Sequence, residues 1–200
     1  MNKSSKTFRM TMIALFAAVL SVLSQIAIPM PSGVPVTLQT MAVALCAYML
    51  GVKGGVLCIA VYLALGAVGL PVFANLGAGL GKLVGVTGGF LFGFLPMAAL
   101  CAWGFRMKNK VLGALLSAAG LVVCHLLGVI QFALLTHAAP LQAFLTVSAP
   151  YLIKDALSIA AAWLFAHTIQ RRTAGEPSDA ALKDGAACRK SAKGTGNERN

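Results

Sequence analysis

One acidic residue stands apart from the other charged residues of this 200-residue chain. Asp155 lies in an apolar stretch, whereas the other four Asp and Glu residues fall within residues 171–200. A carboxylate accepts hydrogen bonds from N–H donors, and an ionisable side chain inside a membrane span usually has a function. We therefore interpret Asp155 as a contact for a small ligand. The alternative is a structural role in which the carboxylate stabilises helix packing.

Lys154 directly precedes this acid and allows two interpretations. Neighbouring helical positions point about 100° apart, so we expect the two side chains not to face each other well. Lys154 either binds a ligand carboxylate as a point charge or extends its ammonium to the membrane surface. Tyr151 and Ser158, four residues before and three after Asp155, share its helix face. Together they predict a polar stripe that a ligand can contact.

A glycine-rich segment supplies most of the other polar side chains. Residues 69–94 contain eight glycines and lie between two apolar runs. Irregular backbone at membrane depth is tolerated only where protein buries it or where it lines a water-filled cavity, and glycine lets the backbone approach a ligand. We expect a loop that forms part of a small-molecule site; a plain connector is the alternative. Asn75 and Lys82 lie in this loop, and Gln39 lies near the start of the predicted span over residues 37–50. Each can form hydrogen bonds either with a ligand or with nearby backbone.

The composition places these residues in a membrane. Hydrophobic residues make up 58% and charged residues 10% of the chain, and the mean hydropathy is +0.84, whereas about 25% of a soluble domain is charged. The net charge of +11 gathers at the ends of apolar stretches and in the tail, which the positive-inside rule explains without nucleic acid. The sequence shows no nucleophilic triad, phosphate-binding loop or metal-ligand cluster. We therefore expect no enzymatic activity, no catalytic residue, no metal and no cofactor.

The apolar stretches predict an all-α protein with six transmembrane helices, about as many as 200 residues allow. They cover residues 9–28, 37–50, 56–70, 88–105, 111–136 and 149–170, with a loop over residues 137–148. Residues 1–170 are thus expected to form a substrate-binding domain with the glycine-rich loop between its third and fourth helices. Residues 171–200 are polar and charged, which predicts a disordered basic cytoplasmic tail.

Six spans put both termini on the same side of the membrane. All Lys and Arg residues except Lys82 and Lys154 fall on or near that side. The positive-inside rule then predicts cytoplasmic termini and a multi-pass protein of the cell membrane.

Two pairs of residues inside the spans are assigned to packing. His125 and Gln131 are expected to be buried and hydrogen-bonded rather than to bind a ligand. Ala14 and Ala18, four residues apart in the first span, form a small-residue face that lets another helix approach closely. That helix belongs either to this bundle or to another subunit.

Three segments carry a resemblance to a known family: VPVTLQTMAV (34–43), GAVGLPVFANLGAGLGKLVGVTGGFLFGF (66–94) and PYLIKDALSIAAAWL (150–164). They resemble the BioY family, the biotin-binding S components of energy-coupling-factor (ECF) transporters. The resemblance implies a six-helix protein that binds biotin near the extracellular side. It also implies partnership with a transmembrane T component, which Ala14 and Ala18 would contact, and with two cytoplasmic ATPases. The ligand-binding acid of the family corresponds to Asp155.

Biotin's chemistry suits these residues. Its ureido ring offers two N–H donors and one acceptor, and its valerate chain ends in a carboxylate. We expect Asp155 to accept a ureido N–H, a lysine to bind the carboxylate, and Gln39 or Asn75 to serve the ureido carbonyl. The other expected contacts wall or line the site: Phe73, Leu76, Tyr151, Thr87 and Ser158.

Three positions depart from the family's pattern. Ser158 stands where a lysine is usual, Phe90 replaces a tyrosine, and Asn75 stands where glycine is common. Two cations, Lys82 and Lys154, therefore remain candidates for the biotin carboxylate. An autonomous secondary transporter or channel, in which Asp155 carries a proton, is the alternative function; a scaffold without ligand is a third.

Overall fold

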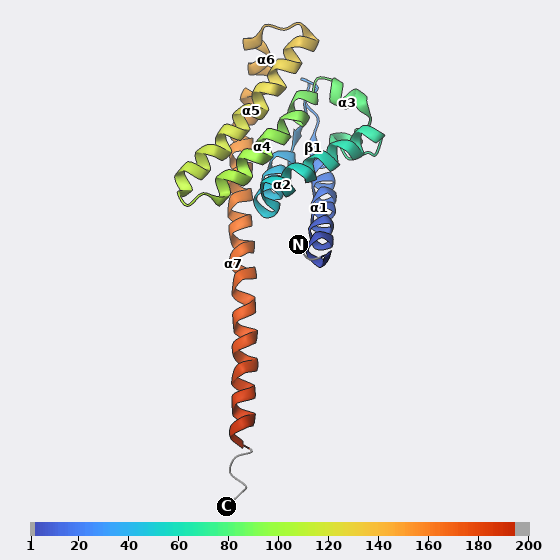
Figure 1. Cartoon of the computed structure of the whole chain (residues 1–200). Helices are drawn as coiled ribbons and strands as arrows, with labels where there is room; N and C mark the ends of the chain where they lie inside the picture. The colour runs from blue at the N-terminus through green and yellow to red at the C-terminus, as the bar shows by residue number, and fades with distance from the viewer. Residues whose placement is uncertain (1–2, 195–200) are drawn as a thin grey trace, which may run out of the picture. The chain divides into compact units, whose positions relative to one another are not determined.

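The computed structural model describes the backbone of residues 3–194 and the side chains of residues 6–172. This part of the chain is almost entirely helical (Figure 1). Its elements are α1 (Lys3–Ser24), β1 (Ala27–Ile28), β2 (Val36–Thr37), α2 (Gln39–Val68), the short 3-10 helix η1 (Ala74–Leu76), α3 (Leu80–Val84), α4 (Gly88–Arg106), α5 (Lys110–Thr136), α6 (Pro140–Val147) and α7 (Ala149–Gly194). Residues 1–163 form one compact unit and residues 164–200 a second.

The prediction of an all-α, multi-pass membrane protein is confirmed. Among the described residues, five helices are long and apolar enough to cross a membrane: α1, α2, α4, α5 and the part of α7 up to Arg172. The sixth predicted span arises because α2 is two helices joined at a break.

The break in α2 is at Gly51, which has φ 74° and ψ −179°. A residue with a side chain rarely adopts this positive φ. The two arms fold back on each other, because an ideal Cβ on Gly55 would lie 2.9 Å from the Cα of Ala47. In a continuous helix these residues would be about 12 Å apart. The turn that was predicted over residues 51–55 therefore involves fewer residues than expected, because the chain is helical again directly after Gly51.

The first helix begins and ends earlier than predicted. α1 ends at Ser24, and β1 and β2 then pair antiparallel, with Ala27 opposite Thr37 and Ile28 opposite Val36. Ile28 precedes a proline, and the residue before proline favours extended backbone over helix. The two strands thereby close the proline-rich loop between them.

A short helix also replaces part of a predicted loop. Residues 137–148 were expected to be irregular, but α6 covers Pro140–Val147. Pro140 stands in its first turn, where a missing N–H costs nothing and the fixed φ suits a helix. A proline that usually interrupts helices here begins one.

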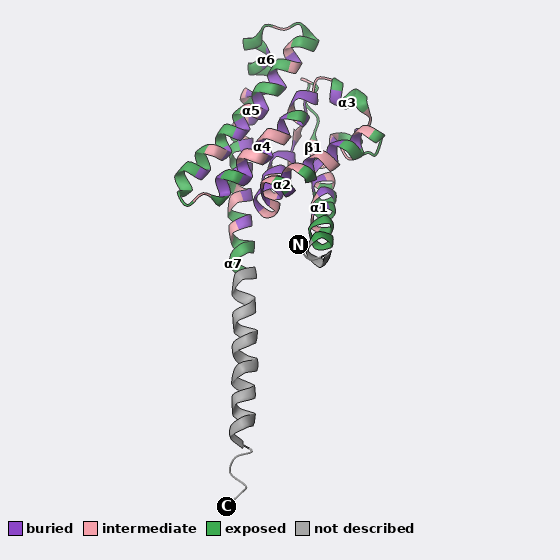
Figure 2. Ribbon diagram, viewed as in Figure 1, coloured by how far each residue is buried: buried purple, intermediate pink, exposed green. Residues whose placement is uncertain are grey.

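The hydrophobic core lies around α2 and α4. In these two spans 61% of the most apolar window is buried, compared with 22% in α1, and Figure 2 shows the exposed outer surface of α1. Tyr48 of α2 stacks on Phe105 of α4 at 4.8 Å and meets Trp163 of α7 edge-on at 5.4 Å. Its hydroxyl donates to Ser117 of α5 at 3.2 Å. One aromatic cluster thus joins four helices at the end of the bundle away from Asp155.

The predicted tail extends beyond the described side chains. The backbone of α7 is helical to Gly194, but side chains from residue 173 onward lie outside the described part. The disordered tail over residues 171–200 therefore stays a prediction.

The close contact between the arms of α2 yields a stability prediction. We expect Gly55→Ala to lower the free energy of unfolding by about 1–3 kcal/mol, because the added methyl group overpacks against the backbone of Ala47. Gly81→Ala in α3 is the matched control, since its ideal Cβ has no atom within 4 Å. Thermal unfolding in detergent measures both; an equal effect of the two substitutions would contradict the hairpin.

Candidate functional site

An enclosed cavity lies between the start of α2, the start of α4, the middle of α5 and the start of α7. Segments far apart in the sequence line it: the loop before α2, the glycine-rich segment, and three helices. Eight of the ten predicted ligand contacts are in this lining, namely Gln39, Phe73, Asn75, Lys82, Thr87, Tyr151, Lys154 and Asp155. The enclosed space is about 100 Å³, less than the roughly 300 Å³ at which small-molecule pockets begin.

Leu76, which was expected to wall the ring, is 71% exposed and lies outside this lining. Ser158 is the other predicted contact that lies elsewhere. It is buried, but it lines a separate groove with Met41 and Leu157. Ser158 lies on nearly the same helix face as Asp155, yet three residues place it about 4.5 Å further along the axis. It therefore falls below the floor of the cavity, and its assignment to the site is not supported by this geometry.

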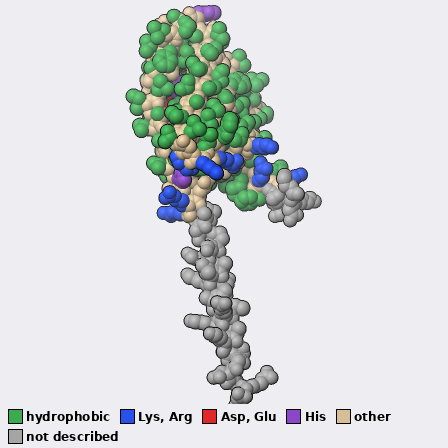
Figure 3. Space-filling model, turned by 60° about the vertical axis from the view of Figure 1, so that its left-hand side comes forward, with side chains coloured by type: hydrophobic (Ala, Val, Ile, Leu, Met, Phe, Trp, Pro, Cys, Tyr) green, Lys and Arg blue, Asp and Glu red, His purple; other side chains and the backbone are tan. Residues whose placement is uncertain are grey.

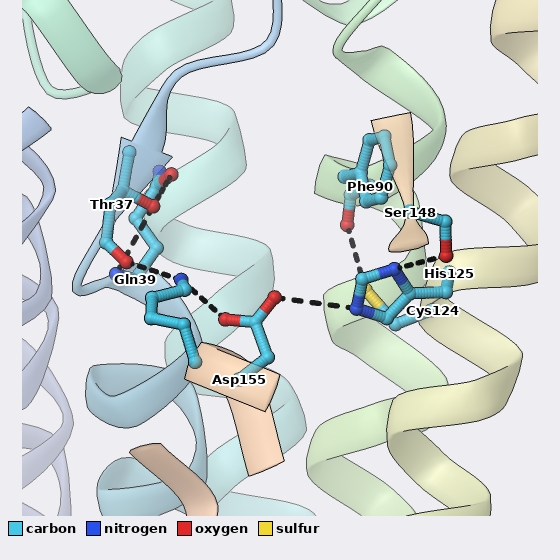
Figure 4. A network of polar contacts seen from close by, with 8 residues as sticks. Thr37, Gln39, Phe90, Cys124, His125, Ser148 and Asp155 are labelled. Atoms are coloured by element: carbon cyan, nitrogen blue, oxygen red, sulfur yellow. Dashed lines mark hydrogen bonds and ion pairs between the residues drawn. The ribbon is translucent and has the colours of Figure 1, made fainter. Parts of the chain in front are cut away.

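Asp155 is the centre of a buried polar network. Its side chain is 8% exposed, and its Oδ2 lies 3.3 Å from Nε2 of His125 (Figure 4). The other ring nitrogen of His125, Nδ1, lies 2.9 Å from the hydroxyl of Ser148. These contacts tie α7 to α5 and to the junction between α6 and α7.

Lys154 forms an ion pair with Asp155, contrary to the expectation that the two side chains do not face each other. Its ammonium also donates to the backbone carbonyl of Thr37 at 2.7 Å. The four methylene groups of a lysine let its ammonium bend around the helix surface. The angle of about 100° between neighbouring side chains therefore did not predict whether Lys154 reaches Asp155. Lys154 therefore links α7 to the end of β2.

His125 was predicted to be buried and hydrogen-bonded, which is confirmed, but the sequence analysis did not place it in the site. Leu121, His125, Gly128 and Phe132 are spaced three or four residues apart and all are buried. A polar side chain on such a stripe requires a polar partner. Asp155 is the one acid within residues 6–172 that could be this partner. A buried histidine and a buried acid on two different spans are therefore the pattern from which the pairing could have been predicted.

The glycine-rich segment forms the roof of the cavity. Phe73 is 2% exposed and meets Tyr62 of α2 edge-on at 5.4 Å. Asn75 has φ 57°, a left-handed conformation that glycine and asparagine adopt most readily. This explains how asparagine replaces the glycine common at this position. Gln131 holds the far end of the roof, with its amide nitrogen 2.8 Å from the carbonyl oxygen of Gly85.

The residue that directly follows α1 fastens the near end of this roof. The amide nitrogen of Gln25 lies 3.2 Å from the carbonyl oxygens of both Pro71 and Phe73. Its amide oxygen accepts from the backbone N–H of Leu76 at 3.0 Å. Ser24 adds a hydrogen bond to the carbonyl oxygen of Val72. The roof is therefore attached to the last turn of α1.

The two candidate cations differ in their contacts. Lys154 is bound to Asp155 and Thr37. Lys82 is exposed and lines the cavity. Within the part of the chain whose side chains are described, its ammonium has neither a hydrogen bond nor an ion pair. Lys82 is thus the lysine of the cavity with a free charge.

Both polar atoms of the Gln39 side chain form hydrogen bonds within the protein, whereas the sequence also allowed them to bind a ligand. Its amide nitrogen donates to the hydroxyl of Tyr62 at 2.7 Å, and its amide oxygen accepts from Thr37 at 3.0 Å. Tyr151 donates to the carbonyl oxygen of Val34 at 2.6 Å. Apolar rings and side chains complete the walls: Phe90, Leu91, Phe94 and Val147.

These features define a helical, multi-pass membrane protein with a cavity between its helices, polar at the floor and rim and apolar between them. The sequence model of the BioY family matches residues 1–175. The chain belongs to the BioY family.

Relatives and a solved structure agree with this assignment. The chain is 36% identical to "Biotin transporter BioY" of Rhodobacter capsulatus, over 80% of this chain and 91% of the relative. It is 35% identical to "Probable biotin transporter BioY" of Pyrococcus horikoshii, over 84% and 99%. It is 45% identical to "Biotin transporter BioY2" of Lactococcus lactis, over 56% of this chain and 62% of that relative. In fold it is similar to a crystal structure of the S-component for biotin from an ECF-type ABC transporter, with a TM-score of 0.78 at 20% identity, over 86% and 95% of the two chains.

The attachment of the roof to α1 yields a prediction about local opening. We expect Gln25→Leu to speed amide hydrogen exchange of residues 72–79 about ten- to hundredfold, because the roof loses hydrogen bonds worth about 1 kcal/mol each. Exchange in the aromatic cluster around Tyr48 should not change. Gln142→Leu on the exposed face of α6 is the control. Unchanged exchange over residues 72–79 would show that the roof is held by other contacts.

Proposed function

We propose that this chain is the biotin-binding S component of an ECF-type transporter. The observation that carries the proposal is the arrangement of charge in one cavity. The acid Asp155 lies at the buried floor, the unpaired Lys82 lies at the exposed rim, and aromatic and aliphatic walls separate them. The names of the relatives support biotin as the molecule that fits this arrangement.

The cavity suits the two ends of biotin. Lys154 and His125 each occupy one oxygen of the Asp155 carboxylate. A carboxylate has about four lone-pair sites, so acceptor capacity remains for a ureido N–H. In this proposal the ureido ring lies at the floor, Phe73 and Tyr151 wall the ring system, and Asn75 and Thr87 contact the ligand from the roof.

Of the two lysines, we propose that Lys82 meets the valerate carboxylate. Lys154 holds Asp155 and Thr37, and turning toward a second anion would break both contacts. Among the described side chains, Lys82 has no such contact to lose.

The cavity volume of about 100 Å³ is small for biotin, which supports a movement of the roof when the ligand enters. The roof is the segment with positive φ at Asn75 and Leu76 and with attachment points at Gln25 and Gln131. We infer that it opens between these points and closes over the bound ligand.

We further propose that the partners are a transmembrane T component and cytoplasmic ATPases, and that both termini are cytoplasmic in the cell membrane. Ala14 and Ala18 are exposed on α1, the least buried of the described spans. This open small-residue face supports contact with another membrane helix. Among described Lys and Arg residues, those visible in Figure 3 gather at one end of the bundle, which supports the orientation.

The His125–Asp155 pair is the observation that favours the second candidate function, an autonomous proton-coupled transporter. Chains of His and acidic residues carry protons in such proteins. Biotin uptake by vesicles containing this chain alone, with an imposed pH gradient, separates the candidates. An S component binds biotin there without accumulating it.

The first functional prediction concerns Asp155. We expect Asp155→Asn to weaken biotin binding about ten- to hundredfold, the usual effect of losing a hydrogen bond to a charged group. It should also lower thermal stability, because Lys154 is left without its counter-ion. Calorimetric titration and thermal unfolding on the same preparation measure the two effects.

The double variant Asp155→Asn/Lys154→Met tells the two roles of the acid apart. With both charges removed, stability should recover toward that of Lys154→Met alone while biotin affinity stays low. A double variant that binds biotin like the unmodified chain would make Asp155 purely structural.

A second prediction assigns the carboxylate. We expect the unmodified chain to bind biotin about tenfold more tightly than biotin methyl ester, and Lys82→Gln to bind both equally, because the free cation of the rim is gone. Lys53→Gln, an exposed lysine outside the cavity lining, is the control. If the preference for the acid survives Lys82→Gln but is lost in Lys154→Met, the assignment of the two lysines is reversed.

A third prediction concerns the partner face. Ala14→Trp should abolish copurification with the T component, because a bulky ring prevents close helix approach. Biotin affinity of the isolated chain should change less than twofold. Ala14→Ser keeps a small side chain and should assemble normally; equal assembly of the Trp variant would place the interface elsewhere.

A further inference from the structure

A second cavity lies at the opposite end of the bundle from the ligand site. It has a volume of about 660 Å³, within the range of small-molecule sites. Its walls come from the first half of α1, the break in α2 and the end of α4. None of its lining residues belongs to the cavity around Asp155.

Three cations line this second cavity without a counter-ion. Arg9, Lys53 and Arg106 are all exposed. Within residues 6–172, the sole acid is Asp155, which lies at the other site, and none of the three cations forms an ion pair. Three like charges around one cavity repel each other and create a positive potential that attracts an anion.

The break in α2 positions one of these charges. An ideal Cβ at Gly51 would lie 2.1 Å from Nη2 of Arg106, so the guanidinium occupies the space that a side chain would take. The guanidinium of Arg106 therefore lies at the point where α2 reverses, and both Arg106 and Lys53 line the cavity. A guanidinium presents a planar fork of donors that matches phosphate oxygens.

The rest of the wall is apolar and extends along α1 from the exposed Phe8 to the partly buried Phe16. Phe8, Met12, Ile13 and Phe16 come from α1, and Met49 and Leu50 come from α2. Phe8 is 63% exposed. An inorganic anion would make no use of this surface, whereas an amphiphile places its charged group and its chain on the two parts together.

We propose that this second cavity is a groove that binds one anionic phospholipid of the adjacent leaflet. The phosphate lies between Arg9, Lys53 and Arg106, and an acyl chain lies along the wall that α1 forms from Phe8 to Phe16. The positive charge of the site favours an anionic over a zwitterionic headgroup, and its apolar wall favours an amphiphile over free phosphate. Basic residues at a membrane surface each strengthen binding to anionic lipid by about fivefold.

The test counts lipids bound to the purified full-length chain by native mass spectrometry. Dioleoyl-phosphatidylglycerol and dioleoyl-phosphatidylcholine are compared at equal concentrations. We expect one tightly bound phosphatidylglycerol per chain, and a loss of about 25-fold in its affinity for the pair Arg9→Gln/Lys53→Gln. The matched pair Lys6→Gln/Lys108→Gln removes the same charge without touching the groove lining and should change affinity less than twofold. A hundredfold excess of inorganic phosphate should displace no lipid.

Three outcomes would overturn the proposal. Equal losses in the two pairs would mean that only the general surface charge attracts lipid. Displacement by inorganic phosphate would make the site an anion site. Unchanged lipid binding together with lost copurification of the T component in Arg9→Gln/Lys53→Gln would make the groove a protein interface. Thermal unfolding and biotin titration of each pair confirm that the variants are folded.

Discussion

The structure depends on one constraint: a carboxylate is held inside an apolar helical bundle. An isolated charge there is strongly unfavourable, and it becomes tolerable only when other charges and hydrogen bonds surround it. Asp155 obtains them from Lys154 on its own helix and from His125 on α5. Lys154 in turn bonds the strand end at Thr37, and His125 bonds Ser148. Compensation of a single charge thus fixes where α5, α7 and the loop before α2 meet, and that meeting point is the floor of the cavity.

Much of this arrangement could be predicted from the sequence because the apolar spans contain few polar side chains. An acid in an apolar span has few available partners, so Asp155 and the polar residues of the glycine-rich segment had to converge. Residue type alone did not reveal how far each side chain reaches. Lys154 contacts Asp155 because its chain is long and flexible, and Ser158 misses the cavity because the cavity ends one turn above it.

For the fold, too, the sequence pattern predicted which segments are helical but not how the chain turns between them. Hydropathy located the spans, but the hairpin of α2 depends on φ at Gly51 and on the contact of Gly55 with Ala47. α6 was missed because a proline at a first helical turn and a proline in a loop look alike in a sequence. Long-range contacts such as those of Gln25 with residues 71–76 leave no local pattern, since glutamine at a helix end has many alternative partners.

The attachment of the roof to Gln25 has a thermodynamic consequence. Gln25 directly follows α1, the helix on which Ala14 and Ala18 are exposed, so the roof of the cavity and this exposed face are connected through one helix. If a protein bound to that face favours one position of α1, it alters the free energy of closing the roof. Linkage then requires the reverse effect to have the same size: the vitamin must change the affinity of the bound protein by the factor by which that protein changes the affinity of the vitamin. If such a protein binds, ligand binding and assembly would then measure the same coupling free energy, transmitted through the last turn of α1.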